Sequence, residues 1–139
     1  MLSFVKTIEI NAPPDRVFRI MADVEKWPEW TRTVTSIKRL DAGPLKVGSR
    51  ARVKQPKLIT AVWTVTRLEP GRGFAWVSRS PGVRVTGGHW TEPNGTGTRL
   101  TLSLLFEGLL APLAAWMFRG LNEKYLNIEA AGLKRTCEQ

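Results

Sequence analysis

Alternating apolar and polar residues dominate the middle of the chain. In residues 98–106, Leu100, Leu102 and Leu104 alternate with threonine and serine, a period typical of a β-strand with one buried face. Similar patterns, bounded by turns rich in glycine, proline and asparagine, predict strands over residues 2–10, 33–40, 47–54, 59–68, 73–79, 83–92 and 98–106. The buried face is expected to carry Val47, Ala51, Val53, Ile59, Ala61, Trp63, Val65, Phe74, Trp76, Ser78, Val83, Val85, His89, Leu100, Leu102, Leu104 and Phe106.

Two other segments have the period of a helix. Residues 11–24 start with Asn11 and two prolines, which suit a helix start, and Pro28 is expected to end this helix and begin a short second one. A helix of about 25 residues is predicted to close the chain. It begins with an uncharged run, residues 108–118, and its side facing the sheet is expected to carry Leu110, Leu113, Ala114, Met117, Leu121, Ile128 and Ala131.

The order of these elements defines the fold class. Consecutive strands joined by short turns are expected to pair antiparallel, with the helices on one side of the sheet. The sequence therefore predicts an α+β protein with a curved sheet of about seven strands, and its 139 residues fit a single domain over residues 1–139. Trp116 and Phe118 lie outside the inward arc of the helix. A curved sheet wrapped around the helix, with Trp27 and Trp30 nearby, can contact more than one of its sides; alternatively, Trp116 and Phe118 form a dimer patch or rest on the short helices.

Charge adds a possible partner but no defined site. The net charge is +9, which raises nucleic acid or anionic lipid as partners. The basic residues are scattered, however, and the nearest approach to a cluster is Arg50, Arg52, Lys54 and Lys57. No RNA-binding signature accompanies them, so a solvated basic face is favoured over a nucleic-acid site.

The location follows from a few negative features. The uncharged run is shorter than the ~20 residues needed to cross a bilayer, and residues 1–14 do not have the pattern of a secretory signal. Cys137 is the single cysteine, so no internal disulfide is possible. We expect a cytoplasmic protein without membrane insertion, monomeric or homodimeric.

Candidate chemistry centres on one residue. His89 is the only histidine, and its alternation with Val83 and Val85 points it toward the apolar face. It is either a polar anchor or general base in a cavity, or a core histidine paired with a backbone carbonyl. Most acidic residues, Glu129 among them, are predicted in turns or on solvent-exposed faces of helices and strands. No acid pair, metal cluster or phosphate-binding loop emerges, so no metal and no cofactor is expected.

Several longer segments resemble a known family. They are APPDRVFRIMADVEKWPEW (12–30), GPLKVGSRARVKQP (43–56), WTVTRLEPGRGFAW (63–76) and GGHWTEPNGTGTRLTL (87–102). Together with the element order, they resemble the polyketide cyclase/dehydrase and lipid-transport-like group of the helix-grip superfamily. The resemblance implies a curved antiparallel sheet that grips the C-terminal helix around an apolar cavity. Members bind lipids, sterols, polyketides or plant hormones, and some catalyse cyclisation or hydrolysis.

We therefore predict binding of a small hydrophobic or amphipathic molecule in an internal cavity. A cyclase/dehydrase-type or hydrolase enzyme acting on a polyketide-like aromatic substrate is the alternative, with His89 as its candidate catalytic residue. A basic module that binds anionic lipid or nucleic acid is the second alternative. Ser49 is a further polar candidate for the cavity. The residues predicted to contact the ligand are Val53, Gln55, Trp63, Val65, Phe74, Trp76, Ser78, Val85, His89, Leu102, Leu104, Leu113, Met117, Leu121 and Tyr125.

Overall fold

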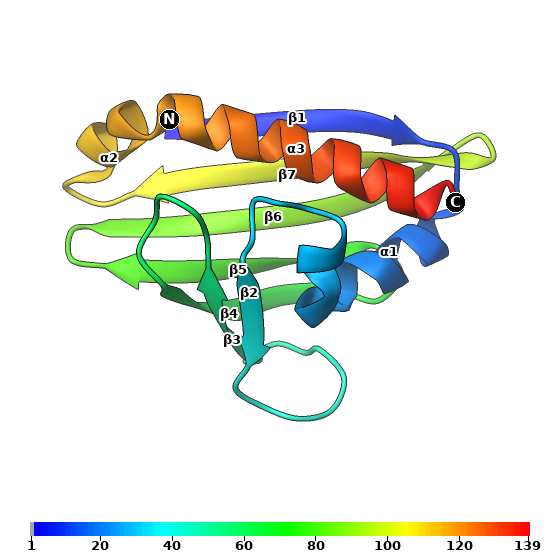
Figure 1. Ribbon diagram of the computed structural model, residues 1–139, viewed down its shortest axis with the longest axis horizontal. Coiled ribbons are helices and arrows are strands. Elements are labelled where there is room, and N and C mark those ends of the chain that lie inside the picture. The colour runs from blue at the N-terminus through cyan, green and yellow to red at the C-terminus, as the bar shows by residue number, and fades with distance from the viewer. Residues whose placement is uncertain (1) are drawn as a thin grey trace.

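Seven strands form one antiparallel sheet in the computed structural model, which describes residues 2–139 (Figure 1). The strand order is β1-β7-β6-β5-β4-β3-β2, so β2 to β7 follow one another as hairpins and β1 pairs with β7. The predicted α+β class and the seven strands are confirmed. The strands are β1 (Leu2–Ile10), β2 (Ser36–Arg39), β3 (Arg50–Lys54), β4 (Ala61–Glu69), β5 (Gly73–Ser80), β6 (Val83–Asn94) and β7 (Gly97–Glu107).

Helices cover one face of this sheet. Helix α1 (Pro14–Ala22) and the short 3-10 helix η1 (Val24–Glu29) follow β1, as predicted. Pro28 does not separate them, however, because it lies inside η1, and α1 already ends before Asp23, whose ψ of 70° is not helical. The single long helix expected at the end of the chain is instead two, α2 (Ala111–Met117) and α3 (Arg119–Cys137). The break lies at Phe118, whose φ of −103° and ψ of 10° depart from helical values. Helix α3 crosses in front of β1 and β7 (Figure 1).

The strand alternation predicted the buried face well, except where the strands are shorter than expected. Leu100, Leu102 and Phe106 of β7 are buried. Val47 and Ile59 are exposed, Ile59 by 84%, because β3 begins only at Arg50 and β4 only at Ala61. Both residues therefore lie in loops, where the alternation of a strand no longer applies.

The side of the C-terminal helices that faces the sheet was predicted wrongly. Leu110, Leu113, Met117 and Ala131 are exposed, Met117 by 59%, and of the predicted side only Ala114 lines the pocket described below. The prediction assumed one continuous helix with its most apolar stripe inward. The break at Phe118 separates α2 from the stripe of α3, and the side that turns inward carries polar as well as apolar residues. The residues that are buried here are Ala111, Ala115, Asn122, Leu126, Ala130, Gly132, Leu133 and Cys137.

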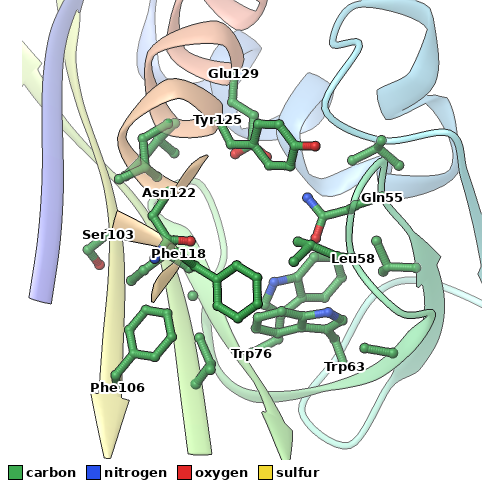
Figure 2. Close-up of a pocket in the computed structure, with 18 of the residues that line it drawn as sticks. Gln55, Leu58, Trp63, Trp76, Ser103, Phe106, Phe118, Asn122, Tyr125 and Glu129 are labelled. Atoms are coloured by element: carbon green, nitrogen blue, oxygen red, sulfur yellow. The ribbon is translucent and has the colours of Figure 1, made fainter. Parts of the chain in front are cut away.

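Trp116 and Phe118, the two residues outside the predicted arc, lie in different environments. Trp116 is 62% exposed, with the Arg119 guanidinium 5.5 Å from the centre of its ring. Phe118 is half-buried and points into the interior (Figure 2). The two side chains therefore do not form one surface patch, and a contact of Trp116 with a second copy of the chain stays a prediction.

Candidate ligand-binding site

A pocket of about 410 Å³ lies between the sheet and the C-terminal helices. Residues of β3 to β7 form its walls, the loop between β3 and β4 forms one side, and α2 and α3 cover it (Figure 2). The volume is within the range of sites that bind small molecules, which are concave and mostly apolar with a few polar groups. The C-terminal helices contribute Ala114, Phe118, Asn122, Tyr125, Leu126 and Glu129.

Aromatic rings form one end of the pocket. The ring centres of Trp63 and Trp76 are 5.7 Å apart, and Trp27 lies 5.4 Å from Trp76. The indole of Trp27 is fixed by a hydrogen bond of 2.9 Å from Nε1 to the carbonyl of Met21 in α1. Gly87 lets the indole of Trp76 pack closely against β6, because a Cβ at this position would lie 3.2 Å from the Trp76 ring. Such rigid, amphipathic walls suit a planar or apolar ligand.

His89 faces the pocket, as its position in the strand predicted, but it is held as a core residue. It is 6% exposed, and its ring stacks on Phe74 with the ring centres 4.5 Å apart. Nδ1 lies 3.3 Å from the carbonyl oxygen of Phe74; a carbonyl only accepts, so Nδ1 carries the proton. Burial lowers the pKa of His89 to about 4. The ring is therefore neutral at neutral pH and a weak base.

Polar side chains gather at the other end of the pocket. The carboxyl oxygen Oε1 of Glu129 accepts a 3.0 Å hydrogen bond from the hydroxyl of Thr33, and burial raises the pKa of Glu129 to about 7. Gln55 donates from Nε2 to the backbone carbonyl of Thr33 over 3.3 Å. The hydroxyl of Tyr125 donates to the carbonyl of Pro56. Figure 2 shows Glu129, Tyr125 and Gln55 pointing toward the same space.

The structure brings together nine of the fifteen residues predicted to contact a ligand, and their contact with one stays a prediction. These nine are Val53, Gln55, Trp63, Trp76, Val85, His89, Leu102, Leu104 and Tyr125. Val65 and Phe74 share the inward face but are completely covered in the core, where Trp27 lies over Phe74. Ser78 does not line the pocket. Leu113, Met117 and Leu121 do not line it either, because the inward side of the helices was assigned wrongly.

Glu129, Asn122 and Phe118 were missed, whereas Ala114 was predicted on the inward side of the helix but not as a ligand contact. The sequence predicts Glu129 on a solvent-exposed surface; this prediction is wrong, because Glu129 lines the pocket. A signal was present, because residues 118, 122, 125 and 129 follow one another at intervals of four, three and four, the spacing of one helix face. An apolar stripe does not indicate this face, because two of its four side chains are polar or charged.

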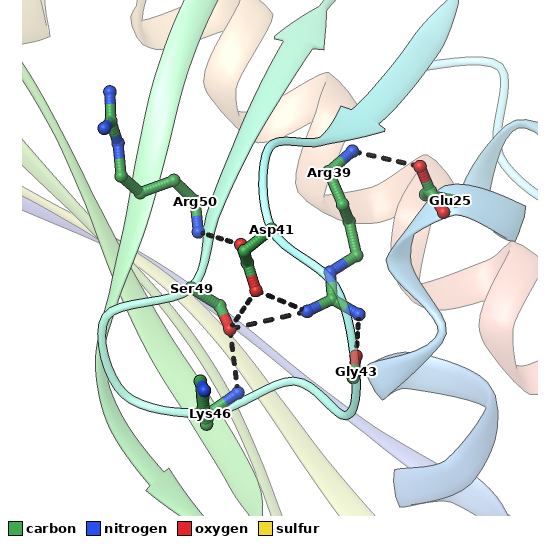
Figure 3. Close-up of polar contacts among 7 residues, drawn as sticks. All are labelled: Glu25, Arg39, Asp41, Gly43, Lys46, Ser49 and Arg50. Carbon is green, nitrogen blue, oxygen red and sulfur yellow. Dashed lines mark hydrogen bonds and ion pairs between the residues drawn. The ribbon is translucent and has the colours of Figure 1, made fainter.

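Ser49, a polar candidate for the cavity, belongs to a separate network in the loop between β2 and β3 (Figure 3). Its hydroxyl donates to Oδ2 of Asp41 over 3.0 Å, and Nη2 of Arg39 donates to the same oxygen over 2.8 Å. The backbone N–H of Arg50 donates to Oδ1 of Asp41 over 2.8 Å. These hydrogen bonds lower the pKa of Asp41. Ser49 therefore has a structural role, closing the loop onto the start of β3.

The basic residues of β3 lie on the outer side of the sheet. Arg50, Arg52 and Lys54 are exposed. In the antiparallel register of β2 and β3, Arg52 lies opposite Lys38, another cation. Lys57 lies in the next loop, at the edge of the pocket. Within residues 2–139, no group of three His, Cys, Asp or Glu side chains is placed to hold a metal ion. No helix of this part of the chain has the length and apolar character needed to cross a membrane.

The comparisons with known proteins identify the family. The family model described as polyketide cyclase / dehydrase and lipid transport matches residues 1–138. The chain belongs to this family. No curated protein matches the sequence.

Solved structures share the fold. The protein TTHA0849 from Thermus thermophilus is 21% identical, with a TM-score of 0.75 over 96% of this chain and 94% of that one. The Zhui aromatase/cyclase from Streptomyces sp. R1128 is 18% identical, with a TM-score of 0.75 over 98% and 93%. The Aha1 dimer from Colwellia psychrerythraea is 17% identical, with a TM-score of 0.70 over 99% and 97%. At these identities the likeness establishes the fold alone, and it confirms the predicted helix-grip arrangement.

Proposed function

We propose that this protein binds a small hydrophobic or amphipathic molecule, such as a lipid, polyketide or other aromatic compound, in the pocket under α2 and α3. The observation that carries the proposal is the pocket itself, about 410 Å³ with indole rings at one end and a few polar groups at the other. A site that was only a packing defect would not combine this volume with converging polar side chains. The family description, which includes polyketide cyclase and lipid transport, supports the same class of ligand.

Tryptophan emission tests this proposal directly. Trp63 and Trp76 line the pocket, so a bound ligand is expected to change their fluorescence at micromolar concentrations, equivalent to about 8 kcal/mol of binding free energy. The titration uses sterols, fatty acids and aromatic polyketides. A flat response to all three classes would contradict the proposal.

Filling the pocket provides the matched test. Ala114 lines the pocket, whereas Met117, one turn further along the same helical segment, is exposed. Ala114→Trp is expected to place an indole in the open space and abolish binding measured by calorimetry, while the protein stays folded. Met117→Trp adds the same ring on the outer side and is expected to bind normally. Equal binding by both variants would mean that the ligand occupies another place.

An enzymatic role of the cyclase/dehydrase type is the second candidate, and Glu129 is the observation that favours it. A carboxyl group with a pKa of about 7 is well matched to proton transfer at neutral pH. His89, the candidate chosen from the sequence, is less suited because its pKa is about 4. The test is to incubate the protein with a linear poly-β-ketone and follow the loss of water by mass spectrometry. Glu129→Gln should stop the reaction, and product formed equally by both proteins would exclude Glu129.

The remaining expectations form part of the proposal. The exposed cations of β3 are spread along the outer side of the sheet, so nucleic acid or anionic lipid is a less favoured partner than a pocket ligand. We propose a monomer or homodimer in the cytoplasm that works without a metal or cofactor. Native mass spectrometry of freshly purified protein would give the oligomeric state and any co-purified ligand in a single measurement.

A further inference from the structure

The polar end of the pocket contains a carboxyl group with only one of its oxygens occupied. Oε1 of Glu129 accepts the hydrogen bond from Thr33, whereas Oε2 accepts none from residues 2–139. Thr33 is fully buried, and its hydroxyl lies 2.9 Å from that of Thr31, so the carboxyl group is held in a fixed orientation. Glu129 is half-buried, and a carboxylate removed from bulk water normally accepts several hydrogen bonds. Glu129 therefore leaves an acceptor directed at the ligand space.

Lys57 is the one cation among the described residues that line the pocket, and neither it nor any other cation of residues 2–139 forms an ion pair with Glu129. Glu129 carries the only carboxyl group among the described residues that line the pocket. His89 is neutral and bonded to a backbone carbonyl, and the hydroxyl of Tyr125 is occupied by Pro56. Arg32, next to Thr33, and Lys57, at the pocket edge, are both exposed to solvent. A second negative charge brought in by a ligand would meet an acid without a counter-ion, in surroundings that already disfavour its ionised form.

A second polar side chain of α3, Asn122, also has an atom without a hydrogen-bond partner. Asn122 is 8% exposed and lines the pocket, and its Nδ2 donor has no hydrogen-bond partner. Asn122 and Glu129 are seven residues apart on one face of α3, which corresponds to about 10 Å along the helix axis. The pocket thus offers a free donor and a free acceptor on one wall, with the indole rings away from them (Figure 2).

We propose that Glu129 makes the pocket selective for ligands whose polar end is an uncharged hydrogen-bond donor, such as an alcohol or a phenol, and excludes ligands that present a carboxylate there. This inference rests on the proposed binding function and deepens it. A hydroxyl group donates to the open oxygen of Glu129, and it brings no charge that would need a counter-ion. A carboxylate cannot donate, and it would be repelled by the ionised side chain.

A matched set of probes tests the selectivity. 2-Naphthol and 2-naphthoate share one ring system and differ in the polar group, and naphthalene has none. Calorimetric titrations are made at about pH 8, above the pKa of Glu129, where its carboxyl group is ionised. The protein is expected to bind 2-naphthol at least about tenfold more tightly than 2-naphthoate, the effect of one hydrogen bond to a charged group.

Two variants assign this preference to Glu129. Glu129→Gln keeps the shape of the side chain and removes its charge, so the preference is expected to disappear, chiefly through tighter binding of 2-naphthoate. Glu123→Gln removes a charge from an exposed position of the same helix and is expected to keep the preference. Lowering the pH to about 6 protonates Glu129 and should reduce the preference in the original protein but not in Glu129→Gln.

The outcomes separate the two proposals. Equal affinity for 2-naphthol and 2-naphthoate, with binding clearly present, would overturn the selectivity and leave the binding function standing. A preference that persists in Glu129→Gln would also overturn it, because another group would then be responsible. If none of the three probes binds to the folded protein, the binding function fails and the selectivity fails with it.

Discussion

Two pocket residues of opposite chemistry dominate this protein at the residue scale, the buried His89 and the half-buried Glu129. His89 is a base that burial keeps neutral, with a pKa lowered to about 4. Glu129 is an acid whose pKa burial raises to about 7. In the unfolded chain their ordinary values are 6.5 and 4.5. Since each group binds protons differently in the folded and unfolded states, each makes stability depend on pH.

The two contributions have opposite signs between pH 4.5 and 6.5. As the pH falls below 6.5, the unfolded chain protonates His89 and the folded protein does not, so stability is lost toward pH 4. As the pH rises above 4.5, the unfolded chain ionises Glu129 while the folded protein keeps the proton, so stability is lost toward pH 7. Each effect reaches at most about 3.5 kcal/mol, at about 1.4 kcal/mol per pH unit.

Urea unfolding at several pH values between 4.5 and 6.5 tests whether the two effects offset each other. It compares the original protein with the variants Glu129→Gln and His89→Gln. The original protein is expected to show a nearly flat free energy of unfolding, because the two effects offset each other. Glu129→Gln should become more stable as the pH rises from 4.5 to 6.5, and His89→Gln should become less stable over the same range. A flat curve for one variant would show that the group which this variant retains titrates normally in the folded state, and flat curves for both variants would show this for both groups.

At the scale of elements, α3 is held close to the segment that follows α1. Gly132 of α3 faces the backbone of Trp30, and a Cβ at this position would lie 2.1 Å from the Trp30 carbonyl oxygen. Gly120 is in the same helix, and a Cβ there would have no neighbour within 4 Å. The first glycine therefore permits a close approach, whereas the second only costs helix propensity.

This pair gives a prediction with its own control. Gly132→Ala is expected to lower the free energy of unfolding by about 1–3 kcal/mol, because the methyl group forces α3 away from Trp30. Gly120→Ala should raise it by about 0.5–1 kcal/mol, because alanine favours the helix. Thermal unfolding followed by circular dichroism measures both. A stable Gly132→Ala protein would mean that α3 moves freely relative to η1.

At the scale of the whole molecule, the pocket joins parts of the chain that lie far apart in sequence. Val53 of β3, Leu102 of β7 and Glu129 of α3 all line it. A ligand that binds there contacts the folded arrangement and cannot bind the unfolded chain in the same way. Binding should therefore stabilise the fold as a whole.

Thermal unfolding with a ligand present checks this coupling. At a ligand concentration of about 100 times Kd, the free energy of unfolding is expected to rise by about 2.7 kcal/mol, which corresponds to an increase in Tm on the order of 10 °C for a domain of this size. Ala114→Trp, with its pocket filled, should show no increase. An equal increase in that variant would place the binding site outside the pocket.

The sequence by itself determined the fold class and most of the sheet. The alternation in β7 and β6 marked Leu102, Val85 and His89 as inward because a strand reverses its side chains at every residue, whatever it packs against. The turn residues fixed the order of the hairpins in the same local way. These features depend on neighbouring residues only, so they could be read without knowledge of the rest of the molecule.

Tertiary structure decided which side of the C-terminal helices faces inward. A hydrophobic stripe predicts the buried side only where the interior is a packed apolar core. Here the interior is a pocket that accepts Asn122 and Glu129, while Met117 and Trp116 remain exposed. The pKa of Glu129 depends on desolvation by elements distant in sequence, and its position depends on Thr33, 96 residues away. The pattern of residues around Glu129 in the sequence does not indicate Thr33 or the elements that desolvate the carboxyl group, because these contacts form only when the chain folds.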